Sequence, residues 1–88
     1  MGIRWSALKS ERLKRIRGVS FEEIIETRVI GIIVHPKIRG QDLMLFERSG
    51  YIWVAPCIIS EDDVFLKTLY PSRKYTKIWK RGGIYEAY

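Results

Sequence analysis

Residues able to do chemistry gather in one stretch, KTLYPSRKYTKIWK, residues 67–80. It holds five lysine and arginine side chains and three aromatic rings around a single Pro-Ser step. Cations bind phosphates, and aromatic rings stack on nucleobases with about 1–3 kcal/mol per base. The stretch therefore fits either a surface that binds a nucleic acid or a solvated helix whose aromatic residues pack in the core.

Lys67 is the first candidate for binding an anion. In a strand, its neighbours on the same face would be Phe65 and Leu69, and a lysine between two apolar residues is unusual on a solvent face. A partly covered cleft there would hold the charge ready for a phosphate. The alternative is an edge strand that uses the lysine to block pairing with another chain.

Arg73 and Lys74 follow a strand end, in the first turn of a predicted helix that also carries Lys77. Cations at a helix N-terminus are mildly unfavourable, because the positive end of the helix dipole lies there. An anion bound between this terminus and the arginine would offset that cost.

Three aromatic residues, Tyr70, Tyr75 and Trp79, could stack on bases. Tyr75 and Trp79 are four residues apart, which places both on one face of a helix. An aromatic stripe at this spacing is more often core, so Trp79 is interpreted mainly as a core residue and Tyr70 is the better candidate for stacking.

The elements that position these residues begin with a helix over residues 6–17. Ser6 can cap this helix and Gly18 is placed to end it. Its apolar residues form a rough stripe: Trp5, Leu8, Leu13 and Ile16.

A second, short helix is predicted from Phe21 to about Arg28. Ser20 followed three residues later by Glu23 is a capping box, and acids in the first turn suit the helix dipole. Capping is therefore a better interpretation of Glu22 and Glu23 than catalysis.

Four short runs of β-branched, aromatic and aliphatic residues follow, which predicts strands. The runs are VIGIIVHP, DLMLFER, YIWVAPCII and VFLKTLY. Short connections favour an antiparallel meander, and the apolar third run predicts a strand covered on both faces. Pro56 in that run removes a ladder donor, which indicates a bulge or an edge position.

The predicted fold class is α+β: two N-terminal helices, a four-stranded antiparallel sheet and a C-terminal helix. A length of 88 residues predicts a single domain over residues 1–88.

The net charge of +6 is unevenly distributed. Residues 1–19 and residues 67–88 each carry a net charge of +5, whereas residues 20–66 carry −4. If the two basic ends fold side by side, they share a surface that binds a polyanion, to which Lys9 and Arg12 would contribute. The alternative is two solvated helices without a shared role.

The chain has one cysteine and one histidine, too few for a zinc site or an internal disulfide. Cys57 lies in an apolar run and is interpreted as core, and His35 as a loop residue. No apolar run is long enough to span a membrane, and residues 1–15 lack the apolar core of a signal peptide. We expect a cytoplasmic protein without metal, cofactor or membrane contact.

These residues resemble a known family. The segment GVSFEEII, a short meander, YIWVAP and FLKTLYPSRK, in that order, are similar to the BrnT family of bacterial toxins, part of the RelE-like superfamily. The most specific pieces are RGVSFEEI (residues 17–24) and KTLYPSRK (residues 67–74), and the resemblance covers Ile3 to Lys80.

The resemblance implies a RelE-like fold, a metal-independent ribonuclease that acts on RNA, and a cognate antitoxin, commonly a ribbon-helix-helix DNA-binding protein. Lys67, Arg73 and Lys74 match basic positions of the family, and they become the expected catalytic residues. The expected chemistry is attack of a ribose 2′-hydroxyl on the adjacent phosphate, with cations stabilising the developing charge. The expected RNA-binding residues are Lys9, Arg12, Tyr70, Tyr75 and Lys77.

The chain departs from the family in its final helix, which mixes basic residues with Tyr75, Thr76, Ile78 and Trp79. No clear general base emerges, and Glu22, His35 and Tyr70 are only candidates for acid or base. The alternative functions are a non-catalytic nucleic-acid-binding regulator and a protein-interaction module on the same fold.

Overall fold

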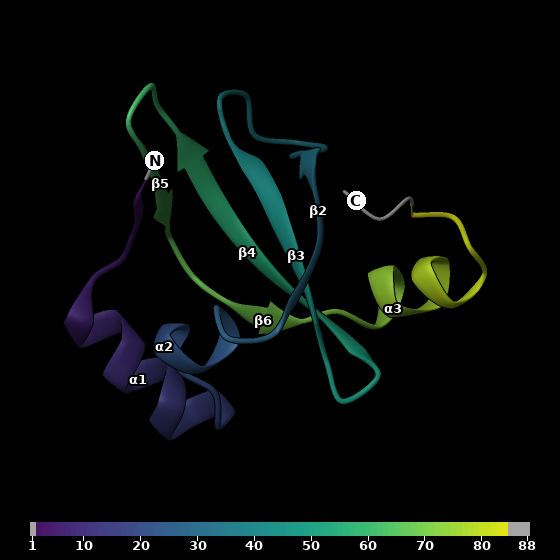
Figure 1. The fold of residues 1–88 in the computed structure, drawn as a ribbon, viewed down its shortest axis with the longest axis horizontal. Coiled ribbons are helices and arrows are strands. Elements are labelled where there is room, and N and C mark those ends of the chain that lie inside the picture. The colour runs from purple at the N-terminus through teal and green to yellow at the C-terminus, as the bar shows by residue number, and fades with distance from the viewer. Residues whose placement is uncertain (1, 85–88) are drawn as a thin grey trace.

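The fold of residues 2–84, described here from a computed structural model, is α+β, as expected (Figure 1). The elements in chain order are β1 (Gly2–Arg4), α1 (Ala7–Arg17), α2 (Phe21–Ile24), β2 (Arg28–Val34), β3 (Asp42–Arg48), β4 (Tyr51–Ile59), β5 (Asp63–Leu66), β6 (Tyr70–Pro71) and α3 (Arg73–Lys80). The strands form one open sheet in the order β1-β5-β4-β3-β2, and β6 also pairs with β4.

The prediction of a four-stranded antiparallel sheet is wrong in two respects. Within residues 2–84 the sheet has six strands, and β1 runs parallel to β5. The predicted fourth strand is divided into β5 and β6, which pair in turn with the two halves of β4.

Pro56 accounts for this division. In an antiparallel ladder, the N–H and C=O of one residue point toward the same neighbouring strand. The C=O of Pro56 accepts the N–H of Lys67 at 2.8 Å, so the backbone of Pro56 points toward the strand that contains Lys67. Because proline has no N–H, β4 offers that strand no hydrogen-bond donor at this position. After Leu66 the chain leaves the ladder, and it rejoins β4 at Tyr70. The irregularity predicted at Pro56 is therefore a break between β5 and β6 in the partner strand. Strand β4 itself lies in the middle of the sheet and not at an edge.

The extra strand β1 is too short to be recognised from its sequence. Its position depends on contacts with residues sixty positions away: the N–H of Gly2 donates to the C=O of Asp62 at 3.1 Å, and Arg4 forms an ion pair with Asp63 at 3.0 Å. These contacts hold the N-terminal end of the chain against β5.

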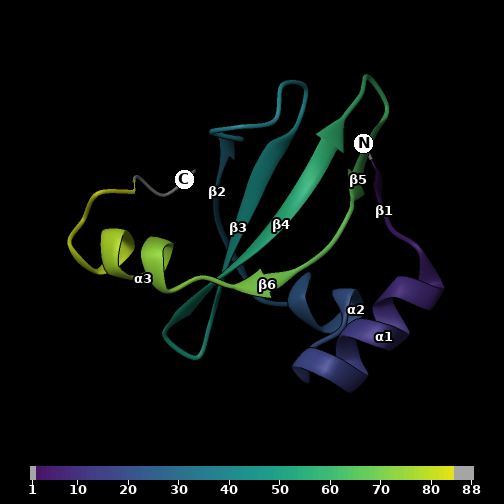
Figure 2. The same ribbon diagram turned by 180° about the vertical axis from the view of Figure 1, so that it is seen from behind.

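The sheet separates two apolar cores, and β4 is buried against both, as its sequence predicted. Helices α1 and α2 cover the first face, which we call the α1 face; its buried side chains include Leu13, Phe21, Met44 and Leu66. The second face is the α3 face, where Tyr75 and Trp79 of α3 pack against a smaller core. That core consists of Ile30, Leu43, Leu45, Ile52 and Val54. In Figures 1 and 2, β6 lies between the two groups of helices.

Helix α1 confirms its predicted ends but not its predicted stripe. The Ser6 side chain accepts the N–H of Lys9, and Gly18 ends the helix with a φ of 79°, in the left-handed region that favours glycine. Leu13 is buried, but Leu8 and Ile16 are 78% and 60% exposed. The side chain that α1 buries together with Leu13 is that of Ser10, which bonds to α2.

Helix α2 is shorter than predicted, because it ends at Ile24 and β2 already begins at Arg28. The predicted capping box is present: the Ser20 side chain accepts the N–H of Glu23, and the Glu23 carboxylate accepts the N–H of Ser20.

Candidate nucleic-acid interface

Two buried hydroxyl residues dock α3 onto β4. Ser72 caps the helix by accepting the N–H of Tyr75 at 3.0 Å, and its own N–H donates to the C=O of Ile52 at 2.8 Å. The hydroxyl of Thr76 accepts the N–H of Ile52 at 2.8 Å and donates to the C=O of Ser72 at 2.6 Å. The β4 groups that β6 does not reach are thus satisfied by α3, which fixes the direction of the helix.

The docked helix turns its cations outward. Arg73, Lys74 and Lys77 are exposed, and Arg73 and Lys74 occupy the first turn, as predicted. Tyr75 and Trp79 are half-buried and pack against the core of the α3 face, so Trp79 is a core residue, as interpreted from its spacing. The Lys74 ammonium lies 5.4 Å from the centroid of the Tyr75 ring. Residues 67–80 therefore match the description of a solvated basic helix with aromatic residues packed on the core, and binding of a nucleic acid to this surface stays a prediction.

Lys67 lies on the α3 face, but not in the surroundings expected for it. The β4–β5 register continues to Lys67 opposite Pro56, on the face to which Phe65 also points. Leu69 is fully buried in the core of the other face, because the alternation breaks after Lys67. The side chain of Lys67 is exposed, so the expected apolar cleft is absent and the charge is presented on an open surface.

Tyr70 lies between Lys67 and α3 along the chain and is half-buried on the same face. It pairs with Val54 in β6 and packs against the α3-face core. Burial, and after it the nearby Tyr75, raises the pKa of the Tyr70 hydroxyl. The hydroxyl is therefore protonated at neutral pH and can donate a hydrogen bond to an anion.

The cations of α1 lie elsewhere. Lys9 and Arg12 are on α1, which packs on the opposite face of the sheet from α3. The condition for a surface shared by the two basic ends, that they fold side by side on one face, is not met.

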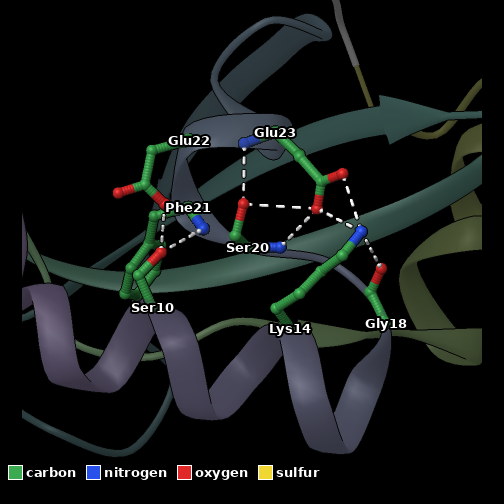
Figure 3. A network of polar contacts seen from close by, with 7 residues as sticks. All are labelled: Ser10, Lys14, Gly18, Ser20, Phe21, Glu22 and Glu23. Atoms are coloured by element: carbon green, nitrogen blue, oxygen red, sulfur yellow. Dashed lines mark hydrogen bonds and ion pairs between the residues drawn. The ribbon is translucent and has the colours of Figure 1, made fainter.

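Two of the candidate acid–base residues have structural roles. Glu22 accepts a hydrogen bond from the Ser10 hydroxyl (Figure 3) and another, at 3.0 Å, from the Trp5 indole. These bonds, chiefly that from Ser10, lower the pKa of Glu22. It lies on α2, on the opposite side of the sheet from α3. In the β2–β3 turn, Nδ1 of His35 accepts the N–H groups of Lys37 and Ile38, both at 3.0 Å. The interpretation of His35 as a loop residue agrees with these bonds.

Sequence reasoning missed one carboxylate on the α3 face. Glu47 follows Leu43 and Leu45 in the alternation of β3, so it lies on the same face as they do. It is opposite Ile52, whose backbone is hydrogen-bonded to Ser72 and Thr76. Its Oε2 accepts the N–H of Gly50 at 2.8 Å. The alternation in DLMLFER predicts this position, because residues two apart in a strand lie on the same face and Glu47 is two residues after Leu45.

Cys57 is a buried core residue, as interpreted, and burial, together with nearby Asp42, raises the pKa of its thiol to about 11. Across residues 2–84, no group of three histidine, cysteine, aspartate or glutamate side chains could hold a metal ion. Among the helices in this part of the chain, none is long and apolar enough to cross a membrane.

No protein-family model, curated protein or solved structure matches this chain significantly.

Proposed function

We propose that the chain is the toxin of a toxin–antitoxin pair, a RelE-like endoribonuclease of the BrnT type that binds RNA over the α3 face. The observation that carries this proposal is the grouping of Lys67, Tyr70 and the first turn of α3 on one open face. Exposed cations beside half-buried tyrosines suit a ligand with alternating phosphates and bases.

The proposed reaction is attack of a ribose 2′-oxygen on the adjacent phosphorus. The bond from phosphorus to the 5′-oxygen breaks, leaving a cyclic phosphate on one fragment and a hydroxyl on the other. Lys67 and Arg73, with Lys74, neutralise the charge that builds on the phosphate oxygens. The Tyr70 hydroxyl suits hydrogen-bond donation to the same oxygens, because burial raises its pKa and disfavours its ionised form, and the leaving 5′-oxygen takes its proton from water.

The proton of the attacking 2′-hydroxyl needs an acceptor. Glu47 is the carboxylate that suits this role, because it lies on the α3 face opposite Ile52, whose backbone holds the start of α3. Glu47→Gln, which preserves its size and one acceptor oxygen, should therefore lower the cleavage rate more than RNA affinity.

The partners follow from the same proposal. RNA is the substrate, and an antitoxin, commonly a ribbon-helix-helix DNA-binding protein in such pairs, would neutralise the toxin. Such a pair acts in the cytoplasm, where its RNA is found.

A second candidate is a nucleic-acid-binding regulator without cleavage activity. It is favoured by one observation: Glu22 and His35, two of the residues considered for acid–base chemistry, are engaged in hydrogen bonds that hold α2 and the β2–β3 turn. In this case the α3 face would bind RNA or DNA through phosphates, with a steep dependence on salt and no cleavage.

Cleavage of a labelled single-stranded RNA in excess EDTA separates the two candidates. We expect the wild-type chain to cut, and Lys67→Ala and Arg73→Ala each to lower the rate at least about tenfold, since removing one charge-stabilising group costs a factor of this order or more. Lys9→Ala, on the opposite face, is the matched control and should keep the wild-type rate. Binding without cleavage would favour the regulator, and cleavage unaffected by both α3-face variants would refute the assigned site.

A further inference from the structure

The two edges of the sheet differ in how they are protected. The edge strand β1 has only three residues, and Arg4 in it is paired with Asp63. The other edge strand, β2, has seven residues, and within residues 2–84 its strand partner is β3 alone. The outer side of β2 is therefore the longer edge open to pairing.

The backbone of β2 points outward at Ile32 and Val34. The N–H of His35 donates to the C=O of Gln41 at 3.1 Å, so His35 faces β3. Alternate residues of an antiparallel strand point their N–H and C=O toward and away from the partner. Ile33 therefore also faces β3, whereas Ile32 and Val34 present both backbone groups to the outside.

The same two residues carry exposed apolar side chains. Ile32 is 47% and Val34 77% exposed, and both lie on the α1 face in register with Met44 and Asp42 of β3. Natural sheets block such edges with lysine, proline or inward charges, and none of these occurs in Val29–Val34. The bulge between Val29 and Gly31 limits the stretch that a partner can pair with to residues 31–34.

A cationic turn adjoins this edge. Lys37 and Arg39 are exposed in the β2–β3 turn, and Ile38 between them is 47% exposed. The two hydrogen bonds to Nδ1 of His35 give the turn a defined shape. An apolar edge followed by a turn with two exposed cations is complementary to a strand that is apolar along its length and acidic at one end.

We propose that the β2 edge binds an extended acidic segment of a partner polypeptide by strand addition. Backbone groups of the segment pair with Ile32 and Val34, its apolar side chains pack on theirs, and its carboxylates contact Lys37 and Arg39. This surface is separate from the cations of α3, and the proposal does not depend on ribonuclease activity.

A second copy of the chain is a poorer occupant of the edge. Each chain carries a net charge of +6, so that two copies repel one another, whereas an acidic segment is attracted. Dimerisation through β2 is accordingly an outcome that would overturn the proposal.

The test uses the full chain and two synthetic peptides with blocked ends. Both peptides contain Val-Thr-Val-Thr-Val; one ends in two glutamates and the other in two lysines. We expect the acidic peptide to bind at least about tenfold more tightly, as charge complementarity at an interface predicts. It should also slow hydrogen exchange at the amides of Ile32 and Val34. Lys37→Ala with Arg39→Ala should abolish the difference between the peptides.

Ile32→Pro probes the backbone directly. It removes an outward N–H and leaves the hydrogen bonds to β3 intact, so binding should be lost, whereas Ile32→Val keeps the N–H and should bind like the wild type. If Ile32→Pro does not fold, methylating the peptide nitrogens that face β2 gives the same loss. Equal binding of both peptides, exchange at Ile32 and Val34 that the acidic peptide does not slow, or a wild-type dimer that Ile32→Pro dissociates would each overturn the proposal.

Discussion

Glu23 shows how strongly local contacts change the chemistry of one residue. Its carboxylate accepts the N–H of Ser20 at 3.0 Å and forms an ion pair with Lys14 at 2.8 Å (Figure 3). Lys14 and then the Ser20 backbone lower the pKa of Glu23 from 4.5 to about 2. Because the pKa is lower in the folded state, the ionised carboxylate stabilises the fold above pH 4.5, and this contribution is lost as the pH falls toward 2.

Glu23→Gln therefore should destabilise the chain at pH 7 and make little difference near pH 2. Urea unfolding of wild type and variant at pH 7, 4 and 2 measures this convergence. Glu11→Gln removes one charge from the exposed side of α1 and serves as the control. A deficit for Glu23→Gln that is the same at all three pH values would contradict the assigned cause of the shift.

Residues whose role depends on nearby sequence were predictable, and others were not. The caps at Ser6, Ser20 and Gly18 follow from contacts within four residues, so the sequence contains the whole signal. The surroundings of Lys67 depend on Pro56, eleven positions earlier, which interrupts the partner strand. Strand alternation alone therefore placed Leu69 on the wrong face.

The stability of helix α3 depends more on the hydrogen bond between Thr76 and β4 than on the length of the helix. Eight residues make a marginal helix, and the Thr76 hydroxyl joins its first turn to the N–H of Ile52 in β4. Replacing this hydroxyl leaves a buried N–H without an acceptor, which costs about 1–3 kcal/mol.

Thr76→Val should accordingly lower the free energy of unfolding by about 1–3 kcal/mol and speed hydrogen exchange at Ile52. Thr76→Ser keeps the hydroxyl and should lose less, because only a methyl group is removed. Denaturant titration and exchange at the Ile52 amide check both effects. Equal losses in the two variants would show that the methyl group, and not the hydrogen bond, holds α3.

Helix α3 and the strands β2 to β4 were predictable from their residue patterns, and α1 from its capping residues, although only Leu13 of its predicted apolar stripe is buried. Strand β1 was not predictable, because Gly-Ile-Arg has no pattern of its own and is a strand through its pairing with β5, about sixty positions later in the chain. The division of the fourth run into β5 and β6 was missed for a related reason, since it follows from a proline in another strand.

At the scale of the whole molecule, the charge pattern along the sequence is not the charge pattern in space. The two basic ends carry equal net charge, yet α1 and α3 cover opposite faces of the sheet. Composition therefore indicated a polyanion partner without indicating which face receives it. We propose the α3 face for that role, because cations and half-buried tyrosines occur together there.

The salt dependence of RNA binding tests this assignment most directly. Affinity for a labelled single-stranded RNA would be measured against salt for Arg73→Ala with Lys77→Ala on α3, and for Lys9→Ala with Arg12→Ala on α1. Each lost phosphate contact reduces the slope of log affinity against log salt by about 0.7 for a single strand. We predict a slope about 1.4 smaller for the α3 pair and an unchanged slope for the α1 pair. Equal changes for both pairs, or a change for the α1 pair alone, would contradict the account.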